Sequence, residues 1–115
     1  MNLVDFEKLD KLCGGDDKFC QEVFTTFVKV IPTYFNCLQM SLLEENSEDV
    51  LVISCQLRAS AKRCCVDEVV KQCLILEKQI EANDLKGARE TLERIREVLR
   101  RIQDEYPPNV SFLLS

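Results

Sequence analysis

The 115-residue chain contains no histidine, only three glycines and only three prolines. Without histidine, the chain cannot form a histidine-based catalytic triad or a zinc site that combines cysteine with histidine. No glycine-rich phosphate-binding loop is present either. Because glycine and proline are scarce and charged residues are interspersed, the composition favours helices and argues against a disordered chain.

Long apolar runs are also missing. No stretch approaches the roughly 20 apolar residues that cross a membrane. The first seven residues, Met1–Glu7, lack the basic start and the continuous apolar stretch of a signal peptide. We therefore expect a cytoplasmic protein that does not associate with membranes.

The charge balance is acidic. Lysine and arginine number 15 and aspartate and glutamate number 20, so the formal net charge is −5 and the pI is about 4.8. A chain of this charge is repelled by a polyanion, so we expect no nucleic-acid partner. Arg58, Lys62 and Arg63 could still form a local basic patch.

The seven cysteines are an odd number in a chain with no export signal, so we expect free thiols in a reducing compartment. No Cys-x-x-Cys spacing occurs, and neither a metal nor another cofactor is predicted. Cys20 and Cys73 lie on apolar helical stripes, where filling of the core is the simplest interpretation.

The apolar spacing predicts one short helix followed by four longer amphipathic helices. We expect them over residues 3–12, 17–45, 47–63, 66–82 and from 84 to the pair Pro107-Pro108. The first helix should turn Phe6, Leu9 and Leu12 inward. Asp16, Ser47 and Asp84 are the expected N-caps of three of the longer helices, because their side-chain oxygens can accept from free backbone N–H groups. The inward stripes of the second, fourth and fifth helices are Cys20, Val23/Phe24, Phe27, Ile31, Tyr34/Phe35, Leu38 and Leu42; Val66, Val69/Val70, Cys73, Leu76 and Ile80; and Leu85, Ala88, Leu92, Ile95, Leu99 and Ile102.

Pro32 falls inside the second predicted helix. An interior proline removes one hydrogen bond and clashes with the preceding turn, which allows either a kinked helix or two helices. The apolar spacing continues in phase across Pro32, so we favour one kinked helix.

The third predicted helix divides into two opposite faces, because residues three and four apart stack on one side of a helix. The inward stripe is Val50, Ser54, Leu57, Ala61 and Cys64. The outward stripe is Leu51, Cys55, Arg58, Ala59 and Lys62. The outward stripe combines a thiol, two cations and a small residue that lets another molecule approach closely.

The segment Cys55-Gln56-Leu57-Arg58-Ala59-Ser60-Ala61 resembles the signature of histidine-containing phosphotransfer (HPt) domains, which reads roughly His-x-Leu-Lys-Gly-Ser-Ser. In this comparison Cys55 replaces the phospho-accepting histidine. Arg58 matches the lysine that contacts phosphate, Ala59 matches the glycine that admits a receiver domain, and Cys65 stands where a second glycine is usual.

The resemblance implies an all-α, antiparallel up-and-down four-helix bundle with a short extra N-terminal helix. The resemblance covers about residues 3–102; we expect the bundle domain over 1–106 and a C-terminal tail over 107–115. It further implies a phosphorelay, or two-component, signalling protein that is not an enzyme. Its expected partner is the receiver domain of a response regulator, or a hybrid sensor kinase. The expected contact residues are Leu51, Cys55, Arg58, Ala59 and Lys62, and no phosphoryl group is transferred.

Two alternatives remain open. In the first, Cys55 is a nucleophile that accepts a phosphoryl group or responds to oxidants, helped by Arg58 and Lys62, which would lower its pKa. In the second, the bundle is a structural module for dimerisation or interaction, and the aliphatic segment Phe112-Leu113-Leu114 adds to the interface.

Overall fold

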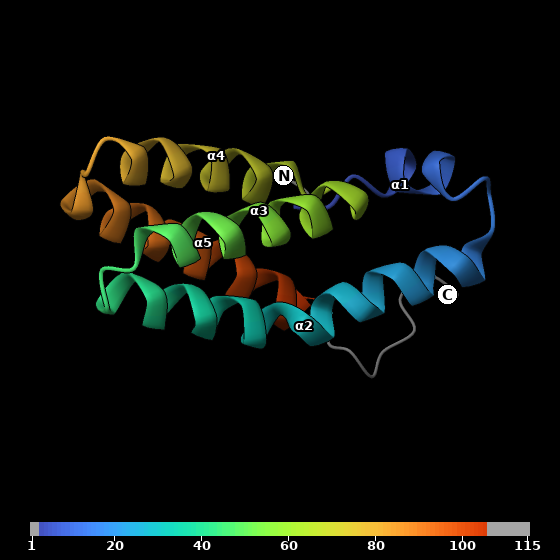
Figure 1. Cartoon of the computed structure of the whole chain (residues 1–115). Coiled ribbons are helices and arrows are strands. Elements are labelled where there is room, and N and C mark those ends of the chain that lie inside the picture. The colour runs from blue at the N-terminus through green and yellow to red at the C-terminus, as the bar shows by residue number, and fades with distance from the viewer. Residues whose placement is uncertain (1–2, 106–115) are drawn as a thin grey trace.

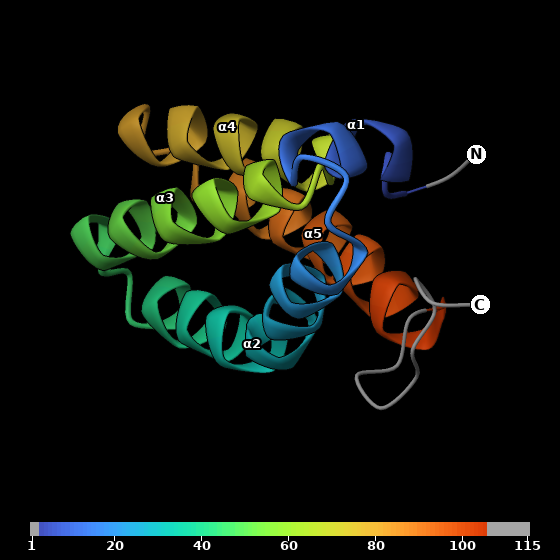
Figure 2. The same cartoon turned by 90° about the vertical axis from the view of Figure 1, so that its right-hand side faces the viewer.

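The computed structural model describes residues 3–105, and all of the regular secondary structure there is helical (Figure 1). The helices are α1 (Phe6–Leu12), α2 (Asp17–Leu43), α3 (Ser47–Arg63), α4 (Asp67–Glu81) and α5 (Leu85–Glu105). The predicted all-α bundle is confirmed. Helices α2 to α5 surround a common core, and α1 lies near the end of the bundle beside the first half of α2 (Figure 2).

The boundary predicted at residue 106 and the tail 107–115, with Phe112-Leu113-Leu114, lie outside the described residues. Within residues 3–105, no helix is both long enough and apolar enough to cross a membrane.

The core contains the predicted inward stripes. Every residue of the inward stripe of α3 is at most 1% exposed. Tyr34, Phe35, Val70 and Leu85 are packed against the core but only partly buried. The prediction for Leu12 is wrong, because this residue ends α1 and is 64% exposed, whereas Leu9 is buried. The start predicted at Leu3 is also wrong, because the Asp5 carboxylate caps α1 by accepting from the Lys8 N–H.

Helix α2 runs without interruption through Pro32, as predicted. Its axis changes direction about halfway along (Figure 1). Pro32 is exposed, so its ring lies on the outer side of the helix, away from the core. A proline at this place bends the helix without ending it.

The three turns between the long helices share one geometry. Each contains a residue in the left-handed conformation: Glu45 (φ 54°), Cys65 (φ 57°) and Asn83 (φ 57°). The next N–H then donates to a carbonyl five residues earlier, as in Val66 N to Ala61 O at 2.9 Å. This bond satisfies a free carbonyl at the end of the helix. The positive φ of Cys65 agrees with the resemblance, in which a glycine is usual at this position, because glycine takes a positive φ at the lowest cost.

Two of the three predicted N-caps are confirmed. The Asp16 carboxylate accepts from Phe19 N at 3.1 Å, and the Asp84 carboxylate accepts from Gly87 N at 2.9 Å. The prediction for Ser47 is wrong, because this residue is already helical and Asn46 is the cap. The Asn46 side chain accepts from Asp49 N at 3.1 Å and donates to the Asp49 carboxylate at 2.8 Å.

The cap of α3 leads to a first prediction. Replacing Asn46 by alanine removes a side-chain acceptor from the first turn, so Asn46→Ala should lower the free energy of unfolding by about 1 kcal/mol. Urea unfolding followed by circular dichroism measures the change. Ser47→Ala is the matched control and should change stability much less. An equal or larger loss in the control would contradict the assignment of the cap to Asn46.

The buried thiols lead to a second prediction. Burial raises the pKa of Cys64 and of Cys73 from the ordinary 9.0 to about 12. In the unfolded chain these thiols lose their protons near pH 9, whereas in the folded protein they keep them, so their contribution to stability is complete below pH 9 and is lost between about pH 9 and 12. Each thiol should lower the free energy of unfolding by about 1.4 kcal/mol per pH unit in that interval.

Urea unfolding at about pH 8 and about pH 10 tests this dependence. The Cys73→Ala variant removes one thiol and keeps the other titrating groups of the chain, so its stability should fall less steeply with pH than that of the parent. Identical slopes for the two proteins would rule out the contribution of Cys73.

Candidate functional site

The outward face of α3 forms the candidate site. The structure leaves Cys55, Ala59 and Lys62 exposed, and it places Leu51 and Arg58 half-buried. Leu51 and Arg58 are seven residues apart, so they lie on the same flank of the helix. The predicted stripe therefore has an exposed part and a flank packed along α4.

Arg58 contacts a carboxylate that the sequence analysis did not identify. Its Nε lies 3.0 Å from Oε2 of Glu77 on α4, and one of its terminal nitrogens donates to Glu77 Oε1 at 3.2 Å. The two side chains are only 31% and 16% exposed. The hydrogen bonds to Glu77 raise the pKa of Arg58, so the pair is a two-pronged, partly desolvated ion pair.

Ser54 contacts the Glu77 carboxylate from the side of the core. Its hydroxyl lies 3.0 Å from Glu77 Oε2 and 3.3 Å from the carbonyl of Cys73. Ser54 is fully buried. A buried hydroxyl with these partners holds the Glu77 carboxylate in one orientation, and the carboxylate in turn holds the guanidinium of Arg58 against α4.

Cys55 lies beside this ion pair. The terminal nitrogen of Arg58 that donates to Glu77 also lies 3.6 Å from Cys55 Sγ. The cation nearest the thiol is therefore already neutralised by a carboxylate. Since the chain has no histidine, no imidazole is available to activate the thiol.

The predicted basic patch is divided by the structure. Arg58 turns toward α4, whereas Arg63 donates to the Ser60 hydroxyl at 3.2 Å, and Ser60 lies 3.4 Å from the Tyr34 hydroxyl of α2. Lys62 is exposed between these two flanks. The three cations thus do not converge on one point.

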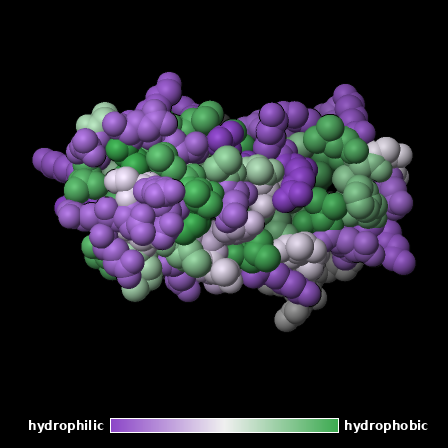
Figure 3. Space-filling view, viewed as in Figure 1, coloured by the Kyte–Doolittle hydropathy of each residue, from purple (hydrophilic) through white to green (hydrophobic). Residues whose placement is uncertain are grey.

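A groove between α2 and the end of α3 adjoins the same face. It has a volume of about 490 Å³ and is lined by apolar side chains that include Phe19, Val23 and Val30, with Arg63 also in the lining. Phe19 is 51% exposed. Figure 3 shows hydrophobic surface gathered on this side of the molecule, over α1 and the first half of α2. The sequence analysis missed the groove, because only the packing of α3 against α2 creates it.

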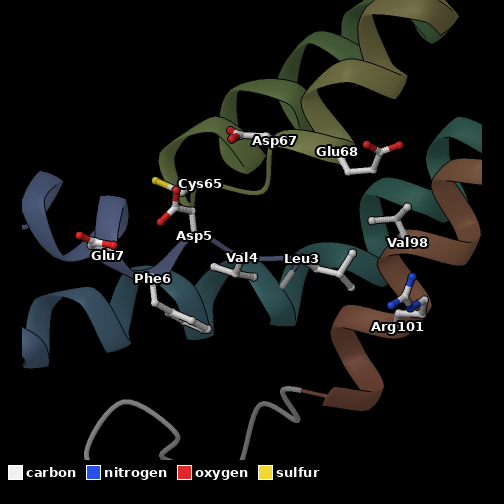
Figure 4. Close-up of a pocket in the computed structure, with 10 residues that line it drawn as sticks. All are labelled: Leu3, Val4, Asp5, Phe6, Glu7, Cys65, Asp67, Glu68, Val98 and Arg101. Carbon is white, nitrogen blue, oxygen red and sulfur yellow. The ribbon is translucent and has the colours of Figure 1, made fainter. Parts of the chain in front are cut away.

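A second hollow, of about 740 Å³, lies between the start of the chain, α4 and α5 (Figure 4). Its four carboxylates are Asp5, Glu7, Asp67 and Glu68. Asp5 caps α1, and the other three lie in the first turns of α1 and α4, where they stabilise the helix dipoles. Their positions thus follow from helix structure alone, and within residues 3–105 no group of three or more Cys, Asp or Glu side chains is arranged to hold a metal ion.

The helical bundle is similar in fold to an HPt domain. The solved structure of "the HPT domain from the Hpt Sensor Hybrid Histidine Kinase from Shewanella" is similar to it, with a TM-score of 0.66 over 91% of this chain and 97% of that chain. The sequence identity is 10%, so the likeness concerns the fold. No family model and no curated protein sequence matches the chain.

The ion pair leads to a third prediction. Because Arg58 and Glu77 are partly desolvated and joined by two hydrogen bonds, a double-mutant cycle of Arg58→Ala and Glu77→Ala should give a coupling energy of about 1–2 kcal/mol. The coupling is measured from the unfolding free energies of the parent, the two single variants and the double variant. Arg96 and Glu93, an exposed pair on α5, provide the control cycle and should couple by less than about 0.5 kcal/mol. Equal coupling in the two cycles would contradict a special role for Glu77.

Proposed function

We propose that the protein is a cytoplasmic phosphorelay adaptor that binds receiver domains of response regulators, or hybrid sensor kinases that carry them. In this proposal it neither accepts nor transfers a phosphoryl group and it is not an enzyme. The binding residues are Leu51, Cys55, Arg58, Ala59 and Lys62 on the outward side of α3.

The observation that carries the proposal is the pairing of Arg58 with Glu77. A phosphoryl acceptor needs an activated nucleophile and a free cation for the incoming negative charge. Here the nucleophile position holds a thiol, and the guanidinium beside it is bonded to Glu77. An incoming phosphoryl group would meet the Glu77 carboxylate, and the repulsion between like charges argues against transfer.

The same face has features that favour binding. Ala59 is small and exposed, so a partner can approach the helix backbone closely. The exposed Lys62 offers a positive charge to the acidic phosphorylation pocket that the HPt resemblance implies for a receiver, and opposite potentials speed association and set register. The groove beside Arg63 adds aromatic and aliphatic surface with one cation and one carboxylate, Glu22, in its lining, and aromatic residues and arginine are enriched in protein interfaces.

A second function is favoured by the 3.6 Å contact between Arg58 and Cys55 Sγ. The Cys55 side chain is exposed, so an oxidant or a phosphorylated partner can reach the thiol. In that case Cys55 accepts a phosphoryl group or responds to oxidants. The same titration and mass measurement separate the two functions.

The fourth prediction is the outcome of that experiment. Each receiver domain of the source organism is titrated into the protein by calorimetry, with and without beryllofluoride as the phosphoryl mimic, and mass spectra are taken after incubation with phosphorylated receiver. We expect binding with no gain in mass. A phosphoryl adduct on Cys55 would favour the second function. Absence of binding to a complete set of receivers would refute the adaptor and would leave self-association, tested by sedimentation, as the remaining use of the bundle.

Variants locate the interface. Ala59→Arg places a long side chain at the point of closest approach and should weaken receiver binding by roughly tenfold or more. Lys62→Glu reverses a charge on the same face and should lower the association rate. Lys86→Glu makes the same charge change at the exposed start of α5 and is the control. If Lys62→Glu and Lys86→Glu weaken binding equally, the interface does not lie on α3.

A further inference from the structure

Four of the seven cysteines come together at one end of the bundle. Cys13 is the C-cap of α1, and Cys20 lies in the first turn of α2. Cys64 and Cys65 lie in the turn between α3 and α4. Cys20, Cys64 and Cys65 are buried, whereas Cys13 is half-buried. The side chain of Cys13 is near enough to those of the other three to influence the pKa of each thiol, and its effect on Cys20 includes a side-chain contact.

Hydrogen bonds to a shared carbonyl also place Cys13 and Cys20 near each other. The Leu9 carbonyl accepts from Cys13 N at 3.0 Å and from Cys20 Sγ at 3.5 Å. Between the two cysteines the chain reverses through Gly14 and Gly15, whose φ angles of 67° and 78° are readily adopted by glycine. The turn therefore brings the backbone N–H of Cys13 and the thiol of Cys20, seven residues apart, to one carbonyl group.

We propose that Cys13 and Cys20 are a thiol pair that a hydroperoxide oxidises to an intramolecular disulfide. In the first step the Cys13 sulfur attacks the peroxide, whose O–O bond breaks, and the products are Cys13 sulfenic acid and an alcohol, or water from hydrogen peroxide. In the second step the Cys20 sulfur attacks the sulfenic sulfur and displaces water, so the two thiols together give up two electrons and two protons.

Burial assigns the order of the two steps. Cys13 is the member of the pair that solvent reaches, so the oxidant meets it first. Burial keeps peroxide away from Cys20 and, with the side-chain contact to Cys13, raises its pKa to about 12, so Cys20 acts only in the second step, slowly, on a sulfenic sulfur held beside it. The raised pKa of Cys20 means that its reduced form is not stabilised as a thiolate, and a disulfide whose reduced form lacks that stabilisation resists reduction. We therefore expect slow formation and a persistent product.

The disulfide would join the end of α1 to the first turns of α2. In the reduced protein these helices meet through side-chain packing, including the rings of Phe6 and Phe24 at 5.6 Å between centroids. The pair lies next to the Phe19 side of the apolar groove. This inference does not depend on receiver binding, and its test uses no partner.

The test uses the full chain with the exposed cysteines replaced, Cys37→Ser and Cys55→Ser, so that disulfides between molecules do not interfere. After treatment with hydrogen peroxide the intact mass should fall by two hydrogen atoms. Trypsin without reductant should then release the peptides 12–18 and 19–29 joined to each other. In the same background Cys13→Ser should abolish the loss of mass, and because Cys13 is only half-buried this variant is expected to fold.

A second variant protects the test against a failure to fold. Cys20→Ala stops the second step, so dimedone should trap a sulfenic acid on peptide 12–18. Three results would overturn the proposal: a loss of two hydrogen atoms that survives Cys13→Ser, a link from peptide 12–18 to 64–71, or a Cys13 that stays reduced while other thiols are oxidised.

Discussion

The complete burial of one side of α3 is the constraint on which the site depends. Leu57 and Ala61 are 0% exposed between α2 and α4, and the small side chains of Ser54 and Ala61 allow close packing there. Because an α-helix is rigid in rotation, fixing one face inward fixes the opposite face outward. Cys55 is therefore presented to solvent by the packing of the opposite face of α3, and any change that rotates α3 would remove the site.

The contact between Arg58 and Glu77 links this scaffold to the proposed function. The same guanidinium contacts the thiol, the carboxylate and, through Glu77, the buried hydroxyl of Ser54. One network thus connects the core to the exposed face, and its members depend on one another. The bundle is similar in fold to a sensor-kinase HPT domain, and in this chain the Arg58 cation on the outward side of α3 is already paired with Glu77.

Cysteine has three different roles in this one small fold. At Cys73 it fills the core, and burial keeps the thiol protonated. At Cys65 it occupies a left-handed turn position that permits the next N–H to close α3. At Cys13 and Cys20 two thiols meet across a turn between helices. The surroundings, and not the residue type, decide whether a thiol is inert or available for chemistry.

The all-α class, the order of the helices and the two faces of α3 were predictable from the sequence, because they follow from the helical repeat of apolar residues and from capping residues next to them. The cap at Asn46 was missed since Asn46 and Ser47 are both good caps and only the left-handed Glu45 decides between them. Glu77, the groove beside α2 and the meeting of Cys13 with Cys20 arise from contacts between helices. Such contacts depend on how far each helix is shifted and rotated against its neighbour, and only the tertiary structure sets those quantities.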